Sequence, residues 1–209
     1  MVLSVMNVEE VMNARKSVRN YDIRRKIPNE TILNMIKLAT TAPSSWNLQH
    51  WKFIIISNSD VKETLLQLAY YQEQVINCSH LILVLGDTKA YRNAEEILTE
   101  QVKKGFMSAE AKDAQIESIM YAYKANKEKY GVHDAIRNGS LAAMQLMLAA
   151  KHFGVDSCPM LSFKEKEIMK VLNVPGHYLP VMMISLGYAA KPAYETIRFP
   201  LERVILGEL

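Results

Sequence analysis

Three short segments of the chain are apolar through most of their length. They span residues 52–57, 80–85 and 178–187, and polar or turn-forming residues bound each of them. Uninterrupted apolar runs of this length are typical of strands that are buried on both faces. The pattern therefore predicts a sheet whose strands lie inside the protein.

Helical spacing of apolar residues is found before and between these strands. A helix is predicted from Pro28 to Ala39, because proline and the residues after it suit the first turn of a helix. The helix ends at the segment 40–43. The same spacing predicts further helices over 60–71, with an extension to 77, and over 163–172. A short amphipathic run at Val8, Val11 and Met12 precedes the first of these helices.

Residues 88–129 have a helical pattern that is more polar than the others. The pattern breaks at Gly105 and restarts near Ser108. We interpret this region as a helical insertion that lies beside the core, and we name it the excursion.

Residues 133–153 predict a helix that is apolar on nearly every side and ends at Gly154. Such a helix must be enclosed by more than one surface, either at the centre of a monomer core or in a dimer. The tail at 191–209 also carries apolar residues beyond the last clear strand, so it needs a surface to lie on. A partner subunit could supply that surface.

The order of the elements does not follow a regular alternation of strands and helices with glycine-rich turns. Helices come first, strands are few, and long helical segments separate them, which favours an α+β sandwich over a doubly wound fold. With 209 residues the chain is long enough for one large core, and we expect a single domain over 1–209.

A basic stretch at 14–22 contains three cations and a hydroxyl within five residues. Arg15, Ser17 and Arg19 are two positions apart, so an extended backbone would direct all three side chains to one side. Guanidinium groups and a hydroxyl suit a phosphate monoester better than a single carboxylate. A solvated basic face or a loose nucleic-acid contact is the alternative interpretation.

Composition narrows the classes of function. The net charge is +3, from 25 basic and 22 acidic residues that are scattered along the chain, so nucleic-acid binding is not implied. Cys78 and Cys158 have no metal-ligand spacing with each other or with the histidines. The first ten residues lack a targeting pattern, and no apolar run approaches a membrane span. We expect a cytoplasmic protein with reduced thiols and no membrane or nucleic-acid partner.

Familiar catalytic motifs are missing from the sequence. It contains no GxGxxG, GxxxxGK[ST], HExxH or GxSxG pattern, and Cys158 is followed by Pro159 in no known nucleophile signature. An enzyme without these parts can obtain its reactive atom from a cofactor.

Three sequence features together resemble the FMN-dependent nitroreductases. They are the Arg-Lys-Ser-Val-Arg stretch at 15–19, the Pro-Ser-Ser-Trp-Asn-Leu-Gln-His-Trp loop at 43–51, and Gly187-Tyr188 followed by a tail with Arg-Phe-Pro-Leu-Glu at 198–202. The resemblance covers essentially the whole chain. It implies a three-layer α-β-α sandwich with a mixed, mostly antiparallel sheet, and a homodimer that exchanges C-terminal tails and holds two FMN molecules at its interface.

The resemblance also assigns binding residues. The phosphate and ribityl chain would be held by Arg15, Lys16, Ser17, Arg19 and Arg198. The flavin ring would be contacted by a loop from the other subunit, with Pro43, Ser44, Ser45 and Asn47, and by a turn with Pro159, Met160, Leu161 and Ser162. Gln74 would donate to the pyrimidine edge. The sequence departs from many relatives at Tyr71, where they have Asn, and no role is assigned to it.

The implied activity is an oxidoreductase reaction, with a hydride passing from NAD(P)H through the flavin to a nitroaromatic, quinone or similar small acceptor in ping-pong fashion. No protein acid or base is required, so no catalytic residue is named. The helices at 88–129, with Tyr91, Phe106, Met107, Tyr121 and Tyr123, could form a mobile substrate wall. Alternatives are a non-enzymatic flavin-binding or regulatory protein, or another reaction of the same scaffold such as reductive dehalogenation.

Overall fold

The computed structural model describes residues 6–207, so the start of the N-terminal segment and the last two residues of the predicted tail lie outside it. Its strands are β1 (Trp51–Ile56), β2 (His80–Asp87), β3 (Asp156–Met160) and β4 (Tyr178–Gly187). Its α-helices are α1 (Val8–Ala14), α2 (Asn29–Ala39), α3 (Ser59–Leu68), α4 (Gln74–Asn77), α5 (Ala94–Lys103), α6 (Ala109–Ala125), α7 (Asp134–His152), α8 (Glu165–Val171) and α9 (Leu201–Val204). Short turns of other helix types are η1 (Ser45–Asn47), η2 (Ala90–Asn93) and the π-helical η3 (Glu128–His133).

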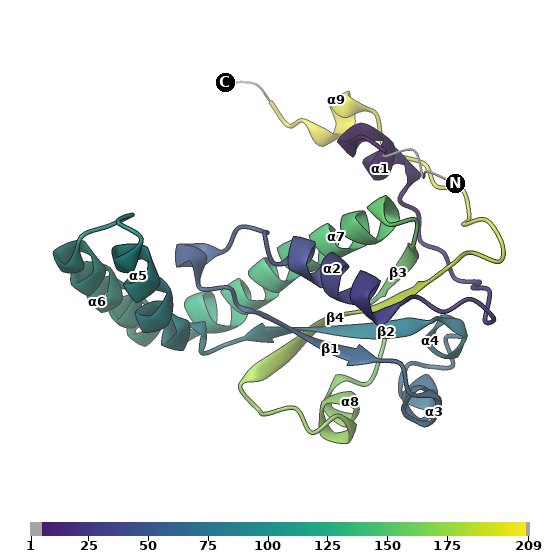
Figure 1. The fold of residues 1–209 in the computed structure, drawn as a ribbon, viewed down its shortest axis with the longest axis horizontal. Helices are drawn as coiled ribbons and strands as arrows, with labels where there is room; N and C mark the ends of the chain where they lie inside the picture. Colours follow the sequence, from purple (N-terminus) through teal and green to yellow (C-terminus); the bar gives the residue numbers. More distant parts are fainter. Residues whose placement is uncertain (1–5, 208–209) are drawn as a thin grey trace.

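The four strands form one sheet in the order β1-β2-β4-β3, and every neighbouring pair is antiparallel (Figure 1). All eight residues of β2 are buried, as its apolar run predicts. Beyond β3, Ser17 forms an isolated parallel bridge with Ser157. The basic stretch therefore continues the sheet past its edge strand and is the one parallel element among the described residues.

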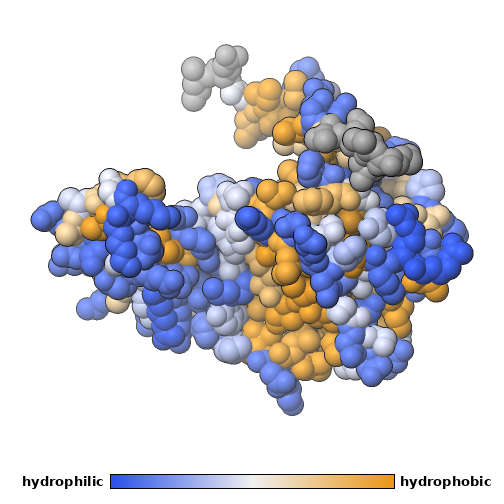
Figure 2. All heavy atoms as spheres, in the orientation of Figure 1, coloured by the Kyte–Doolittle hydropathy of each residue, from blue (hydrophilic) through white to orange (hydrophobic). Residues whose placement is uncertain are grey.

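The other edge of the sheet, at β1, is apolar and uncovered. Leu33 of α2 and Ile55 of β1 are exposed, and Figure 2 shows apolar surface over these two elements. A shallow cavity of about 500 Å³ runs along this edge beside Trp51 and Phe53. Unpaired backbone groups on an edge strand with apolar surroundings favour contact with another segment of chain.

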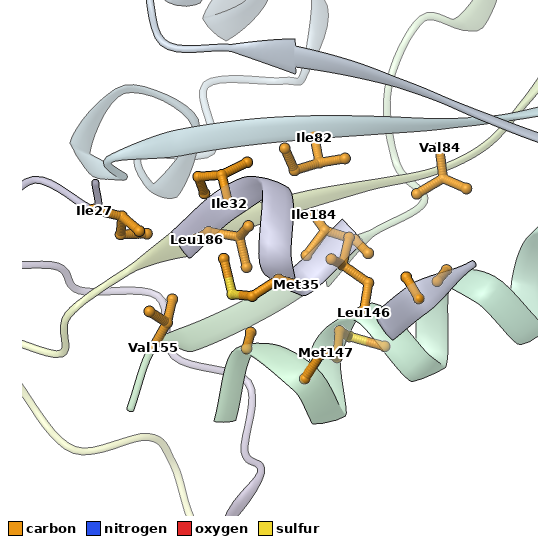
Figure 3. Close-up of a cluster of buried hydrophobic side chains, with 14 of the residues drawn as sticks. Ile27, Ile32, Met35, Ile82, Val84, Leu146, Met147, Val155, Ile184 and Leu186 are labelled. Atoms are coloured by element: carbon orange, nitrogen blue, oxygen red, sulfur yellow. The ribbon is translucent and has the colours of Figure 1, made fainter. Parts of the chain in front are cut away.

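Helices cover both faces of the sheet, which gives the three layers that the family resemblance implies. One face packs against α2 and α7, and the other against α3 and α8 (Figure 1). Side chains of the first cluster, drawn in Figure 3, include Ile32, Met35, Ile82, Val84, Leu146, Met147, Ile184 and Leu186. Because alternate strand residues point to opposite faces, Leu81, Leu83 and Met183 enter the second cluster, with Leu65 and Ile168.

Two glycines allow α7 to lie close to the sheet. A Cβ atom at Gly86 of β2 would stand 2.6 Å from the carbonyl oxygen of Ala135, and one at Gly139 would stand 2.7 Å from Cγ2 of Val181. Real side chains do not tolerate such distances, so these positions need glycine for packing.

Two sequence predictions about elements require correction. The segment from Cys158, interpreted as a turn, is strand up to Met160, because this is an edge strand, where the missing N–H of Pro159 is tolerated. The helix predicted over 60–77 is interrupted, since Tyr70 and Tyr71 have left-handed backbones with φ of 53° and 58°. The predicted helix over 133–153 is confirmed as α7, which packs against the sheet, α2 and α1. Leu141 and Met144 on its remaining side are exposed in the single chain, so the alternative of a dimer stays open.

The polar helices α5 and α6 lie beyond one end of the sheet, beside the core, as the sequence predicts (Figure 1). The break at Gly105, with φ of 72°, and the N-cap at Ser108 are also confirmed. These helices have a small core of their own, which they share with Trp46 and Leu48 of the loop before β1. Among residues 6–207, no helix is both long and apolar enough to cross a membrane.

Candidate functional site

The basic stretch runs along the outer side of β3. The backbone N–H of Val18 donates to the Ser157 carbonyl at 3.0 Å, and the Val18 side chain is buried. Because side chains alternate along an extended segment, Ser17 and Arg19 point away from the side that Val18 occupies. The backbone at 17–19 thus has the alternation that the sequence predicts, and the placement of Arg15 on the same side stays a prediction.

Both arginines of this stretch act on one buried thiol. Burial raises the pKa of Cys158 in β3, and the positive charges of Arg19 and Arg15 oppose this rise. Two guanidinium groups therefore lie near the same strand residue, beside the Ser17–Ser157 bridge. We name Arg15, Ser17 and Arg19 together the basic face. Its donors suit an oxyanion such as a phosphate.

Lys16, between these residues, has a different partner. Its Nζ lies 2.8 Å from both carboxylate oxygens of Glu195, at the start of the tail. The guanidinium of Arg19 lies over the ring of Tyr194, 5.8 Å from the ring centroid. The tail therefore crosses the basic stretch before it leaves the body of the protein.

Arg198 lies further along the tail and bonds only to its neighbours among the contacts described. Its Nη1 donates to the carbonyl of Ile197 at 2.8 Å and to the hydroxyl of Thr196 at 3.2 Å. The structure thus does not bring Arg198 into contact with the basic face of its own chain.

The segment from Pro159 to Ser162 is tied to Gln74 through a third residue. Gln72 donates from Nε2 to the carbonyl of Ser162 at 2.8 Å and accepts from Nε2 of Gln74 at 3.1 Å. Gln74 itself is buried, while Leu161 is exposed. These predicted residues, which are far apart in the sequence, therefore lie at one place next to the end of β3.

The two tyrosines before this network carry an unusual backbone. Tyr70 and Tyr71 are consecutive, both have positive φ, and both side chains are exposed. Bulky residues seldom adopt this conformation, which is held here by the Tyr71 N–H donating to the Leu66 carbonyl and by Gln72 capping Ala69. This backbone leaves two exposed aromatic side chains directly before Gln72, the residue that bonds to Ser162.

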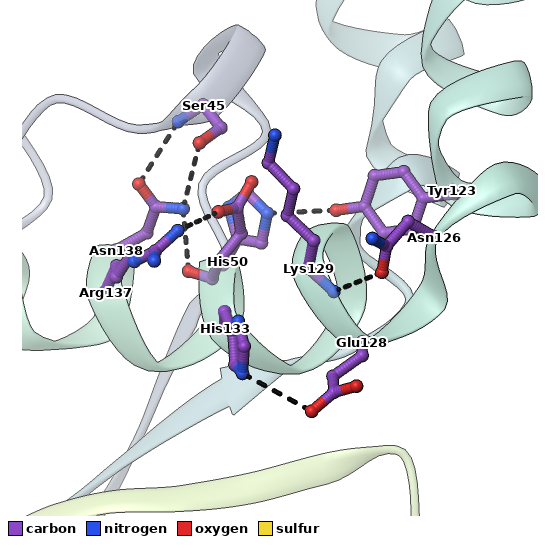
Figure 4. A network of polar contacts seen from close by, with 10 residues as sticks. Ser45, His50, Tyr123, Asn126, Glu128, Lys129, His133, Arg137 and Asn138 are labelled. Atoms are coloured by element: carbon purple, nitrogen blue, oxygen red, sulfur yellow. Dashed lines mark hydrogen bonds and ion pairs between the residues drawn. The ribbon is translucent and has the colours of Figure 1, made fainter.

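The loop from Pro43 to Trp51 is held in shape by α7. Asn138 accepts from the N–H of Ser45 at 3.1 Å and donates to the Ser45 hydroxyl and to the Asp134 carbonyl (Figure 4). Ser44 accepts from the N–H of Gln49, and Asn47 has a φ of 56°. We name Pro43, Ser44, Ser45 and Asn47 together the loop face.

The loop face and the basic face lie at opposite ends of α7 (Figure 1). Asn138 holds the loop near the first turns of the helix, while Ser157, next to Ser17, follows its last turn at His152. Fourteen residues of helix at 1.5 Å each separate these ends by about 21 Å. One chain therefore supplies the two faces at separate places.

A buried hydrogen-bonded pair, His50 and Tyr123, joins the loop to α6. His50 is fully buried, and its Nε2 lies 3.0 Å from the hydroxyl of Tyr123 in α6 (Figure 4). Burial lowers the pKa of His50 and raises that of Tyr123, while Asp134 and Asp87 act against the first shift and add to the second. Both groups are therefore neutral at neutral pH and link the loop to the excursion helices.

Sequence reasoning missed three residues that organise this site. Asn138, Gln72 and Glu195 each bond to a predicted residue, but from positions 93, 90 and 179 residues away in the chain. None of the three belongs to a recognisable sequence motif, so the residues around them in the sequence do not indicate a role in the site.

An α+β sandwich with a basic face beside an edge strand and a separate Ser-rich loop defines the class of this protein. Residues 12–188 match the model of the nitroreductase family, and the chain belongs to that family.

Relatives and solved structures agree with this assignment. The chain is 40% identical over 198 residues to YodC of Bacillus subtilis (strain 168), provisionally named an NAD(P)H nitroreductase, and the match covers 95% of this chain and 97% of that protein. A protein from Exiguobacterium sibiricum 255-15, provisionally named a nitroreductase and solved in complex with FMN, is 32% identical, with a TM-score of 0.92 and full coverage of both chains. A protein from Staphylococcus epidermidis ATCC 12228, provisionally named an NAD(P)H:FMN oxidoreductase, is 31% identical, with a TM-score of 0.93, and the match covers 100% of this chain and 99% of that one.

Proposed function

We propose that this protein is an NAD(P)H-dependent FMN oxidoreductase that acts as a single-domain subunit of a homodimer. The observation that carries the proposal is the basic face, whose segment is held beside β3 by the bridge between Ser17 and Ser157 and by the Val18 hydrogen bond. Membership of the nitroreductase family and the FMN-bound structural relative support it.

The donor groups of the chain fit FMN. A phosphate monoester needs paired charge-assisted donors, and Arg15, Ser17 and Arg19 provide two guanidinium groups and a hydroxyl. Lys16 would bind the same end after exchanging its partner Glu195. When bound, FMN would take a hydride from NAD(P)H and pass reducing equivalents to an electrophilic acceptor such as a nitroaromatic or a quinone.

Other residues of the chain would hold and frame the ring. Gln74 would donate to its pyrimidine edge, with its amide oriented by Gln72. Pro159, Met160, Leu161 and Ser162 would cover one side, with backbone N–H donors at the end of β3. The exposed side chains of Tyr70 and Tyr71 directly precede Gln72, which bonds to Ser162, and we propose that they limit the shape of the acceptor. Donor and acceptor would use the same open side in turn, so we propose ping-pong kinetics.

The dimer is proposed because one chain leaves large apolar surfaces uncovered. Leu141 and Met144 on α7, the edge at β1, and the tail residues Ile197 and Leu206 are exposed in the single chain. Burial of such surface favours association. We propose that each tail, with Arg198, lies on the partner and that each loop face completes the partner's flavin site.

The spectrum of the purified protein tests the proposal. We expect a yellow protein whose flavin absorption band bleaches when NADH or NADPH is added without oxygen and returns when a quinone follows. A colourless protein that fails to take up FMN would contradict the whole proposal. Retained colour without bleaching would leave only the alternative of a non-enzymatic flavin-binding protein.

Replacement of Arg15 tests the position of the phosphate. Arg15→Ala removes a charge-assisted contact of about 1.5 to 3 kcal/mol, so FMN should bind roughly 10- to 150-fold more weakly. Fluorescence titration of the apoprotein with FMN measures this. Arg24→Ala is the matched control, because Arg24 is exposed nearby and pairs with Asp22. Equal FMN affinity of the Arg15 variant and the control would show that the phosphate lies elsewhere.

A further inference from the structure

A second candidate site lies between α6, η3 and the segment that follows β2. It is a cavity of about 640 Å³, within the size range of small-molecule sites. None of the residues expected to bind the flavin lines it. Three of its tyrosines belong to the region predicted as a substrate wall, but the inference concerns binding alone and does not depend on electron transfer.

The walls of this cavity are mainly apolar and face solvent. Met120, Tyr121 and Val132 are 49%, 74% and 37% exposed. Met120 and Tyr121 are neighbours on α6, whereas the core of the excursion uses Ile119 and Tyr123 from the same helix. The exposed side chains thus take no part in holding α6 in place, and they present an apolar surface to a ligand.

Three lysines line the cavity together with its apolar side chains. Lys89, Lys124 and Lys127 line the cavity, and none of the three has an ion pair within residues 6–207. No acidic residue is among the lining residues. The cavity therefore combines an apolar body with a positive rim.

Three acidic residues adjacent in sequence to the lining segments have contacts of their own. Asp134 pairs with Arg137 at 3.5 Å, and Glu128 lies 3.7 Å from His133. The buried Asp87 accepts from the backbone N–H of Lys89 at 2.7 Å. None of these carboxylates forms an ion pair with the three lysines in the part of the chain that the structure describes, so the lysine ammonium groups are available to an anion.

We propose that this cavity binds a small amphipathic anion, a carboxylate or sulfonate on an apolar body of roughly ten carbon atoms. The apolar body lies against Met120, Tyr121 and Val132, and the anionic group lies among Lys89, Lys124 and Lys127. Attraction to exposed lysines is screened by salt, so binding weakens as ionic strength rises.

Calorimetric titration of the full-length, FMN-loaded protein with decanoate tests the proposal, with decyltrimethylammonium as a probe of equal chain length and opposite charge. We expect decanoate to bind at least about tenfold more tightly than the cation. The double variant Lys124→Glu, Lys127→Glu should lose this preference. Lys104→Glu, an exposed lysine of the same excursion outside the cavity, should keep it.

Two results would overturn the proposal. One is equal binding, or absence of binding, of the two probes by the unmodified protein. The other is unchanged decanoate affinity in the double variant, which would place the ligand on another apolar surface. Melting curves of both variants show whether the protein is folded, and exposed lysines should leave them unchanged.

Discussion

The side chain of Asn138, which is far from the loop in the sequence, holds the loop face in shape. Asn138 makes three hydrogen bonds, two to Ser45 and one to Asp134, and is almost fully buried. A buried amide that makes all these bonds ties the loop to α7 at a fixed place.

Replacement of Asn138 should loosen the loop. Asn138→Ala leaves the N–H of Ser45 and the carbonyl of Asp134 without this partner, so we expect a loss of about 1 to 3 kcal/mol of stability. Urea unfolding measures the change, and hydrogen exchange at Ser45 should become faster. Asn13→Ala, on an exposed position of α1, should change neither. Unaltered exchange at Ser45 in the Asn138 variant would mean that the loop holds its own shape.

Buried histidines should make the protein less stable in mild acid. Burial lowers the pKa of His50 and of His80, and Lys62 and Lys26 add to the second shift. The unfolded chain then binds more protons than the folded one, so stability is complete above the unfolded pKa of 6.5 and falls as pH drops through the folded values.

The free energy of urea unfolding, measured between pH 7.5 and 5.5, tests this expectation. It should decrease toward the lower pH. His50→Gln should make this decrease smaller, and the part of the decrease that His80 causes should remain. A flat profile in the unmodified protein would show that folding does not lower the pKa of either histidine.

At the scale of elements, apolar runs predicted β1, β2 and β4 within one or two residues, because buried strands exclude polar residues. The same rule missed β3, whose Pro159 signals a turn unless one knows that the strand lies at an edge. The break after α3 was missed because it is made by Tyr70 and Tyr71, not by glycine. Of the site, the sequence indicated the residue types but not Asn138, Gln72 or Glu195, which meet it only through the fold.

The packing of α7 on the sheet should depend on Gly86. In Gly86→Ala the new methyl group would stand 2.6 Å from the backbone oxygen of Ala135, which cannot rotate away. We expect a loss of about 1 to 3 kcal/mol in the free energy of unfolding. Gly176→Ala is the control, since nothing lies within 4 Å of its added Cβ atom. Equal stability of the two variants would contradict the close approach of α7.

At the scale of the whole molecule, the proposed dimer depends on surfaces that the single chain leaves open. Leu141→Asp places a charge on the exposed side of α7, so we expect sedimentation analysis to show a shift from dimer toward monomer. Val171→Asp changes an exposed apolar residue on α8, which covers the other face of the sheet, and should remain dimeric. A Leu141 variant that sediments like the unmodified dimer would place the interface elsewhere.

The separation of the two faces by the length of α7 has a thermodynamic consequence for the proposed dimer. If each flavin contacts the basic face of one chain and the loop face of the other, subunit association and cofactor binding are linked equilibria. Dilution that separates the subunits would then also release the cofactor, and added cofactor would hold the subunits together. The protein would thus be a better flavoprotein when it is abundant than when it is scarce.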